Sequence, residues 1–252
     1  MRYITTSWDD GHPADRRLSE LLDKYDLKAT FYIPRSNDEH GVMDEKEIVT
    51  LSENFEIGGH TLNHANLERL PLPDAIGEIQ GCYDWLNDIL QKAPASFCPP
   101  FGAFGHQSIN AIYQAGFRVI RTTELLFTRV PGMQKDRIAG RPVTDPLQTL
   151  LHTTLQAYPH TGFTYFKHLL LRRRFSGLGE WRRSGCSSDL FHLLDHYLKD
   201  IEARGGCFHL WGHSWEIEEN NLWDKVEQVF QKIAHLQGFT YVENKDLAPT
   251  IL

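Results

Sequence analysis

The sequence predicts an α/β protein in which parallel strands are wrapped by helices. Short apolar or β-branched runs alternate with amphipathic stretches along most of the 252 residues, and this alternation favours parallel strands joined by helices. Several of the runs end in polar, glycine-containing turns, which are typical of the carboxyl ends of barrel strands. The length suits one large domain, because single α/β barrels commonly reach this size.

The first half of the chain supplies four expected strands, at residues 3–8, 28–33 and 55–57 and in a short run ending near Cys98. Helices are expected over residues 13–25, 44–51 and 73–90. Pro13 suits a first helical turn, where its missing N–H costs nothing. Asp44 is a typical helix N-cap, because its carboxylate accepts hydrogen bonds from backbone N–H groups.

The second half of the chain continues the alternation of strands and helices, with one interruption. Helices are expected over residues 107–115, 187–204 and 222–236, and strands over 117–121, 207–211 and 239–242. Residues 125–185 break the pattern and carry ten Lys or Arg against three Asp or Glu. This stretch therefore has a charge of +7 in a chain of net charge −7, and such asymmetry indicates a separate role. We expect a single domain over residues 1–252, with a basic helical insertion at 125–185.

Composition excludes several classes of protein. The net charge of −7 argues against nucleic-acid binding. Neither a secretory leader nor an apolar run long enough to cross a membrane is present in the sequence, so a cytoplasmic location is expected. The four cysteines show no CxxC spacing and are expected to be free thiols.

The sequence SWDDG at residues 7–11 places Asp9 and Asp10 at the end of the first expected strand. Adjacent residues point in different directions there, so one carboxylate can bind a metal while its neighbour acts as a base. The alternative is an ordinary polar turn, since Asp and Gly are common turn residues.

The sequence GGHTLNH at residues 58–64 holds His60 and His64, four residues apart, after the third expected strand. On a helical turn this spacing brings both imidazoles to one face, and such pairs often bind metals. Because the chain has 13 histidines, a chance HxxxH pair is the alternative.

Two further strand ends carry candidate groups. In CPPFG, residues 98–102, the paired prolines Pro99 and Pro100 stiffen a loop that could hold backbone N–H groups for an oxyanion. In HLWGHSWE, residues 209–216, His213 follows a strand with Trp211 on the same side. A histidine beside an aromatic wall suits a proton donor or acceptor, although a purely structural histidine is the alternative.

Together and in this order, these motifs resemble those of the polysaccharide deacetylases, the NodB-homology family (carbohydrate esterase family 4). SWDDG, HTLNH and CPPFG match the family's first three motifs, and WGH matches its late histidine motif, with Trp211 where the family usually has leucine. The resemblance covers residues 1–121 and 205–245. It implies a distorted barrel of about seven β/α units and a metal-dependent hydrolase that removes the N-acetyl group from an amino sugar or glycan.

The resemblance also implies a role for each matching residue. Asp10, His60 and His64 would hold a divalent metal, zinc in the first place, with cobalt, manganese and nickel as alternatives. Asp9 would be the general base and His213 the general acid. The substrate side would be formed by the CPPFG loop, where Pro100 stiffens the chain and the Phe101 N–H stabilises the oxyanion, and by Trp211 beside the acyl methyl group.

The chain departs from the family at Cys98, where the family usually has an arginine that orients the base. The family's Asp-rich fourth motif is also absent after residue 117, where the sequence reads RVIRTTE. We therefore expect Arg121 to supply the missing cation, and Glu124 to replace a missing carboxylate. A solvated Arg121 at a strand end is the alternative.

The basic insertion suggests an anionic, phosphate-linked sugar as substrate. Its segment FTYFKHLLLRRRF, residues 163–175, could instead contact an anionic membrane surface at the inner face of the membrane, or the insertion could simply pack on the barrel. Other functions remain open: a deformylase or other amidase on the same fold, a sugar-binding pseudo-enzyme, and an iron oxygenase with a two-histidine, one-carboxylate site. The sequence does not indicate an oligomeric state.

Overall fold

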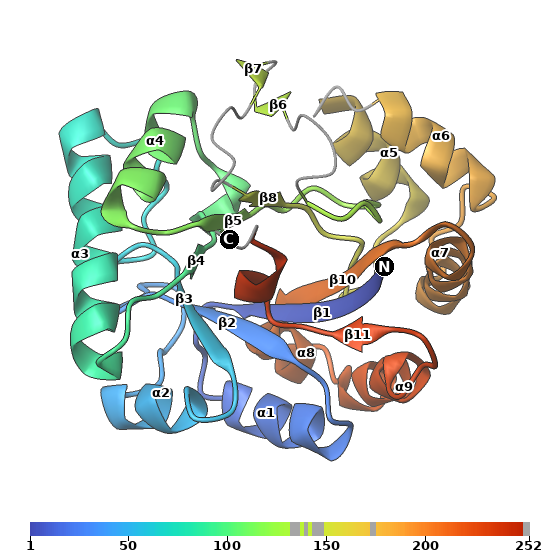
Figure 1. Cartoon of the computed structure of the whole chain (residues 1–252), viewed down its shortest axis with the longest axis horizontal. Coiled ribbons are helices and arrows are strands. Elements are labelled where there is room, and N and C mark those ends of the chain that lie inside the picture. Colours follow the sequence, from blue (N-terminus) through green and yellow to red (C-terminus); the bar gives the residue numbers. More distant parts are fainter. Residues whose placement is uncertain (132–136, 139–140, 143–148, 172–174, 249–252) are drawn as a thin grey trace.

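A computed structural model describes residues 1–131, 137–138, 141–142, 149–171 and 175–248. Its main feature is a nine-stranded sheet in which every pairing is parallel. Eight strands follow the order β8-β5-β4-β3-β2-β1-β10-β9, and β11 pairs with β1 beside this path. Figure 1 shows the sheet curled at the centre with the helices around its outside. The predicted α/β barrel-like fold is confirmed.

The strands are short except at the centre of the sheet. They are β1 (Arg2–Asp9), β2 (Ala29–Ile33), β3 (Glu56–Gly59), β4 (Ser96–Phe97), β5 (Val119–Arg121), β8 (Thr149–Leu151), β9 (Leu155–Gln156), β10 (Gly206–His213) and β11 (Thr240–Tyr241). A separate antiparallel pair joins β6 (Arg137–Ile138) to β7 (Arg141–Pro142).

The helices fall close to their expected positions. They are α1 (Asp15–Lys24), α2 (Glu45–Leu51), α3 (Leu72–Leu90), α4 (His106–Ala115), α5 (Gly162–Leu171), α6 (Phe175–Arg183), α7 (Leu190–Arg204), α8 (Ser214–Glu219) and α9 (Trp223–Ile233), with 3₁₀ turns η1 (Pro100–Gly102) and η2 (Asn244–Leu247). Asp44 caps α2 as predicted, because its side chain accepts a hydrogen bond from Glu47 N while the Glu47 side chain accepts one from Asp44 N.

The largest apolar core lies between the sheet and its outer helices. Trp8, Phe31 and Phe208 on neighbouring strands are fully buried against residues such as Leu18 of α1 and Phe230 of α9. The barrel interior is more polar. At one end, Asn244 of η2 accepts a hydrogen bond from Thr5 Oγ1 and donates one to the Tyr32 hydroxyl, and the backbone N–H of Lys245 donates to buried Glu56. The C-terminal turn η2 thus covers the amino ends of the strands and leaves their carboxyl ends for the site.

The segment expected to be a helical insertion contains the helices α5 and α6, but it also contributes β8 and β9 to the central sheet. These strands have three and two residues, too short to show an alternating pattern in the sequence. Six of its ten cations fall outside what the structure describes in full. They are Lys135, Arg172, Arg173, Arg174 and the side chains of Arg137 and Arg141.

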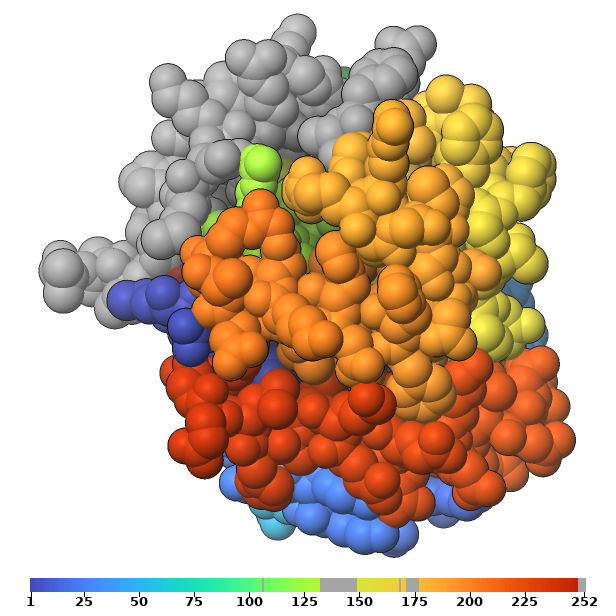
Figure 2. Space-filling view, turned by 90° about the vertical axis from the view of Figure 1, so that its right-hand side faces the viewer, coloured from blue at the N-terminus to red at the C-terminus, as the bar shows by residue number. Residues whose placement is uncertain are grey.

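The helices α7 and α9 lie next to each other on the outside of the β10 side of the sheet. Figure 2 shows this surface, with the orange segment of α7 above the red segment of α9. An ion pair of 2.9 Å between Lys232 Nζ and Asp195 Oδ1 joins the two helices. Among the described residues, no helix combines the length and apolarity that a bilayer crossing needs.

Candidate active site

The end of β1 turns sharply at two residues in succession. Asp9 is the last residue of the strand, and its register partner on the neighbouring β10 is His213. Asp10 and Gly11 follow with positive φ values of 79° and 63°. A Cβ atom at Gly11 would lie 2.5 Å from Ile33 Cγ2, so only glycine fits. This turn sends the Asp9 and Asp10 carboxylates to different neighbours.

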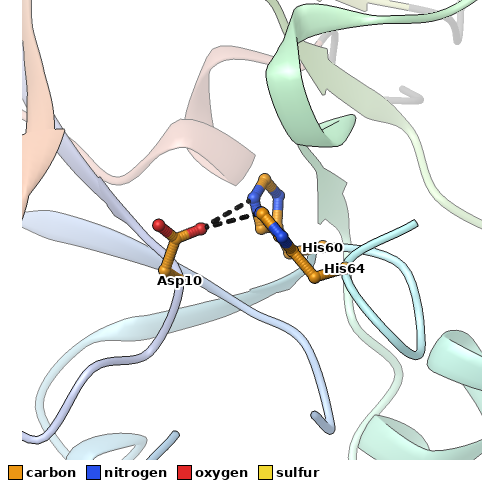
Figure 3. Close-up of side chains that lie close together, drawn as sticks. All are labelled: Asp10, His60 and His64. Atoms are coloured by element: carbon orange, nitrogen blue, oxygen red, sulfur yellow. Dashed lines mark ion pairs between the residues drawn. The ribbon is translucent and has the colours of Figure 1, made fainter. Parts of the chain in front are cut away.

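The two histidines lie in the loop after β3. The expected helical turn is wrong: the loop is not helical, and Thr61 and His64 have positive φ values of 58° and 53°. The imidazoles still converge, because Nε2 of His60 and His64 lie 3.3 and 3.1 Å from Asp10 Oδ1. Figure 3 shows both rings pointing at the same oxygen. All three residues are buried.

The donor set fits a divalent cation. His60 Nδ1 donates a hydrogen bond of 2.6 Å to the Cys98 carbonyl, so the Nε2 of a neutral ring points its lone pair at Asp10 Oδ1. That oxygen is buried and accepts no hydrogen bond of normal geometry. Two lone-pair donors around an orphaned carboxylate oxygen are stable only with positive charge between them. Ligands about 2.1 Å from zinc would be roughly 3.4 Å apart in a tetrahedral site, close to the observed separations.

Electrostatics at Asp10 point the same way. Burial alone would raise the pKa of the Asp10 carboxyl, but positive charge on the adjacent imidazoles of His60 and His64 outweighs burial and holds that pKa far below its usual range. With neutral rings, a bound cation would supply this positive charge. The carboxylate is therefore ionised and available as a ligand across the working pH range of proteins. Its second oxygen, Oδ2, accepts a hydrogen bond of 2.7 Å from Trp215 Nε1.

Asp9 is held by a cation from β5. A guanidinium nitrogen of Arg121 donates to Asp9 Oδ1, and both side chains are buried. Cys98 Sγ lies 3.9 Å from Asp9 Oδ2, and burial raises the pKa of its thiol, which stays protonated. The structure thus places Arg121 against Asp9, as expected from the sequence, and not in solvent.

Arg121 is enclosed by aromatic rings. Its guanidinium carbon lies 5.2 Å from the ring centre of Tyr32 and 4.8 Å from that of Trp211, distances at which a cation is attracted to the ring faces. Burial lowers the pKa of Arg121, but the Asp9 charge outweighs this and raises it overall. The arginine therefore remains a fixed positive charge beneath Asp9.

His213 lies on the other side of Asp9, with 4.0 Å between His213 Nε2 and Asp9 Oδ2. Its Nδ1 is 3.3 Å from Glu216 Oε2. Burial on its own lowers the pKa of His213, but the hydrogen bond to Glu216 and the charges of Asp9 and Asp10 outweigh it, so the pKa is raised. His213 is therefore protonated to a higher pH than a free histidine, as a proton donor needs to be.

Glu216 is itself held by Gln156 of β9, which His160 contacts in turn. Gln156 Nε2 donates to Glu216 Oε2 at 3.0 Å, and Gln156 Oε1 accepts from His160 Nε2 at 2.7 Å. Sequence reasoning missed Glu216 and named Glu124 as the replacement carboxylate, but Glu124 does not line the cavity described below. The available signal was the three-residue spacing between His213, which ends β10, and Glu216, which lies in the first turn of α8.

A cavity of about 480 Å³ opens over these groups. Among the residues predicted for the substrate side, Phe101 and Trp211 line it, whereas Pro100 and Arg121 do not. The lining also includes three carboxylates and no Lys or Arg among the described residues. It is formed by Asp9, Asp10, Glu39, His60, His64, Pro99, Phe101, Thr123, Leu125, Gln156, His160, Thr164, Trp211, His213 and Trp215.

Comparison with known proteins identifies the first half of the chain. Residues 1–120 match the profile of the polysaccharide deacetylase family. Over 109 residues, 42% of this chain, it is 30% identical to a peptidoglycan-N-acetylmuramic acid deacetylase of Bacillus subtilis (strain 168), and it spans only 23% of that protein's length.

Solved structures share the fold of the whole chain. A chitin deacetylase from the fungal pathogen Colletotrichum lindemuthianum superimposes with a TM-score of 0.57 at 13% identity, covering 98% of this chain and 87% of that one. A carbohydrate esterase family 4 pseudoenzyme from Bacillus anthracis gives a TM-score of 0.50 at 14% identity, with 92% and 62% covered. Residues 1–120, a little under half of the chain, thus carry the sequence pattern of the polysaccharide deacetylase family.

Proposed function

We propose that the protein is a metal-dependent amide hydrolase that removes the acetyl group from an N-acetylated amino sugar or glycan. The observation that supports this most directly is the pairing of Asp9 with His213 across adjacent strands, beside the cluster of Asp10, His60 and His64. A carboxylate and a protonated imidazole at one end of a cavity supply the base and the acid that amide hydrolysis needs.

The proposed roles follow from these positions. Asp10, His60 and His64 hold the metal, which when bound polarises the amide carbonyl and makes water more acidic. Asp9 accepts a proton from the water whose oxygen attacks the carbonyl carbon. His213 gives its proton to the nitrogen as the carbon–nitrogen bond breaks, which releases a free amine and acetate.

The oxyanion that forms on the carbonyl needs donors close to the metal ligands. In the proposal, the backbone N–H of Phe101 contributes one, because the Phe101 ring lies 4.9 Å from that of His64 and its backbone bends through a positive φ of 59° at the cavity. Trp211 forms the wall beside the acyl group. A formyl group would fit the same wall, so formamide hydrolysis is the alternative activity.

The charge of the substrate is a separate proposal. An anionic, phosphate-linked sugar would need cations from the basic segment, because the described lining holds carboxylates and neutral groups. A neutral amino sugar fits the described lining better. Assaying free and phosphate-linked sugars side by side decides between them.

The test is hydrolysis by metal-stripped and reconstituted protein. Zinc, cobalt, manganese and nickel are each restored after chelation, and N-acetyl and N-formyl sugars are assayed for released acetate and formate. We expect acetate release that depends on the metal and is lost in Asp9→Asn. Release of formate alone would replace the acetyl proposal with the deformylase.

A pseudo-enzyme that binds sugars is the competing function, favoured by the cysteine at position 98. The contact between Arg121 and Asp9 argues against it, because the base retains a cationic partner. Metal binding without hydrolysis of any N-acyl sugar would establish the pseudo-enzyme.

We also propose a peripheral contact with an anionic membrane through α5, at the cytoplasmic face. Phe163, Phe166 and Leu170 are exposed on this helix by 73%, 44% and 49%, with Lys167 between them. Sedimentation with anionic vesicles at low salt tests this, with Phe163→Ser as the weakened variant. Equal recovery in the supernatant with and without vesicles would remove the proposal.

A further inference from the structure

Trp215 connects the metal ligands to the opposite wall of the cavity. It lies in the first turn of α8, 205 positions along the chain from Asp10, and its indole Nε1 donates a hydrogen bond of 2.7 Å to Asp10 Oδ2. The ring also lines the cavity. None of the motifs that link this chain to its family includes this residue.

The two carboxylate oxygens of Asp10 have different neighbours. Oδ2 is occupied by the indole N–H, whereas Oδ1 faces the Nε2 atoms of His60 and His64. Asp10 has a positive φ of 79°, which is uncommon for a residue with a side chain. Its carboxylate therefore depends on surrounding contacts for its direction, and the described side chains provide one such contact at Oδ2.

The indole is held in turn by contacts with two imidazole rings. The His40 ring, from the loop between β2 and α2, stacks on it with centroids 4.1 Å apart and planes 20° apart. The His213 ring lies 5.2 Å away, tilted by 38°. Trp215 thus cannot rotate without disturbing either the loop or the histidine that faces Asp9.

We propose that Trp215 is a positioning residue that orients the Asp10 carboxylate so that Oδ1 faces the Nε2 atoms of His60 and His64, the residues that would hold the metal. The inference rests on the proposed metal site. Outer hydrogen bonds to metal ligands of this kind typically change metal affinity by about 10–100-fold when they are removed. Because His40 stacks on Trp215, the orientation of Asp10 also depends on the loop between β2 and α2.

The test compares Trp215→Phe with Trp223→Phe. Both remove an indole N–H and keep an aromatic ring, but Trp223 donates to Glu218 and does not line the cavity. Dissociation constants for Zn²⁺ and Co²⁺ are measured without substrate by chelator competition, together with the visible spectrum of the Co²⁺ form. We expect Trp215→Phe to weaken both metals by about 10–100-fold and to alter the spectrum, and Trp223→Phe to change neither.

Thermal unfolding of the metal-free proteins shows whether each variant is folded. If Trp215→Phe fails to fold, His40→Ala replaces it, because this variant keeps the N–H and removes the stacking that fixes it; a weakened metal affinity is again expected. Wild-type affinity and spectrum in the folded variant would overturn the inference. Wild-type protein that binds neither metal would overturn the proposed function as well, so the two failures are distinguishable.

Discussion

The two sides of the site differ in where their supporting residues come from. On the metal side, Asp10, His60 and His64 lie in two motifs that match the family, and the His60 ring is fixed by the backbone of residue 98. On the proton-transfer side, Asp9 and His213 match the family, but their partners Arg121 and Glu216 come from positions that the family motifs do not include. A backbone contact tolerates a change of side chain, whereas a side-chain contact has to be rebuilt elsewhere.

The largest effect should come from the metal side. Asp10→Ala removes the only carboxylate of the three-residue cluster, and we expect loss of metal and a fall in kcat/KM of at least about 10³-fold, because several kcal/mol of transition-state stabilisation are lost. Metal content and acetate release are measured together. Full activity in metal-free Asp10→Ala would mean that this cluster is not the reaction centre.

On the proton-transfer side, His213→Ala should lower kcat by about 10²–10⁴-fold while the metal affinity stays within a few-fold of wild type. This outcome would separate the two sides functionally. A variant that lost its metal as well would show that His213 also supports metal binding. The metal side and the proton-transfer side would then not be functionally separate.

Arg121→Ala should act mainly through stability. It leaves the Asp9 carboxylate buried without its cation, and removing one partner of a buried ion pair costs about 3–5 kcal/mol of unfolding free energy. Urea denaturation measures this cost. Arg118→Ala, an exposed arginine beside the same strand, is the matched control and should change stability by less than about 0.5 kcal/mol. Equal effects of the two substitutions would contradict the assigned contact.

Glu216→Gln should have the smallest effect. Burial lowers the pKa of His213 and Glu216 is the main group that raises it, so without this charge the pKa falls. Because the acid must be protonated, the alkaline limb of the kcat–pH profile should move to lower pH. The loss near neutral pH should stay within about tenfold for each pKa unit. Glu218→Gln, an exposed carboxylate on the same helix, should leave the limb in place.

Much of the metal side could be predicted because its residues follow strands directly. Asp10 directly follows the last residue of β1, and the histidines come after β3, so the parallel order of the strands brings them to one edge of the sheet. The prediction of local geometry is wrong. The four-residue spacing of His60 and His64 indicates a helical turn, but the rings come together in a loop with positive φ values at Thr61 and His64. The short loop sequence GGHTLNH, residues 58–64, gives no periodic signal for such a bend.

The partners on the other side were harder to predict for a different reason. Arg121 was named because it ends the strand next to Cys98, and adjacent parallel strands end near each other. Glu216 and Trp215 depend on the direction in which α8 leaves β10, and a six-residue helix shows too little of its period to reveal this. The short strands β8 and β9 were missed for the same reason.

The register of β1 and β10 has a further consequence. Asp9 and His213 are register partners on two hydrogen-bonded parallel strands. The backbone therefore fixes the distance between their Cα atoms. The loops around the site can therefore change in sequence without altering the separation of these two Cα atoms. One residue inserted into β10 before position 213 would turn its histidine to the far face of the sheet. In the proposed mechanism such a shift would take the proton donor away from Asp9, although SWDDG and HTLNH would be unchanged in the sequence.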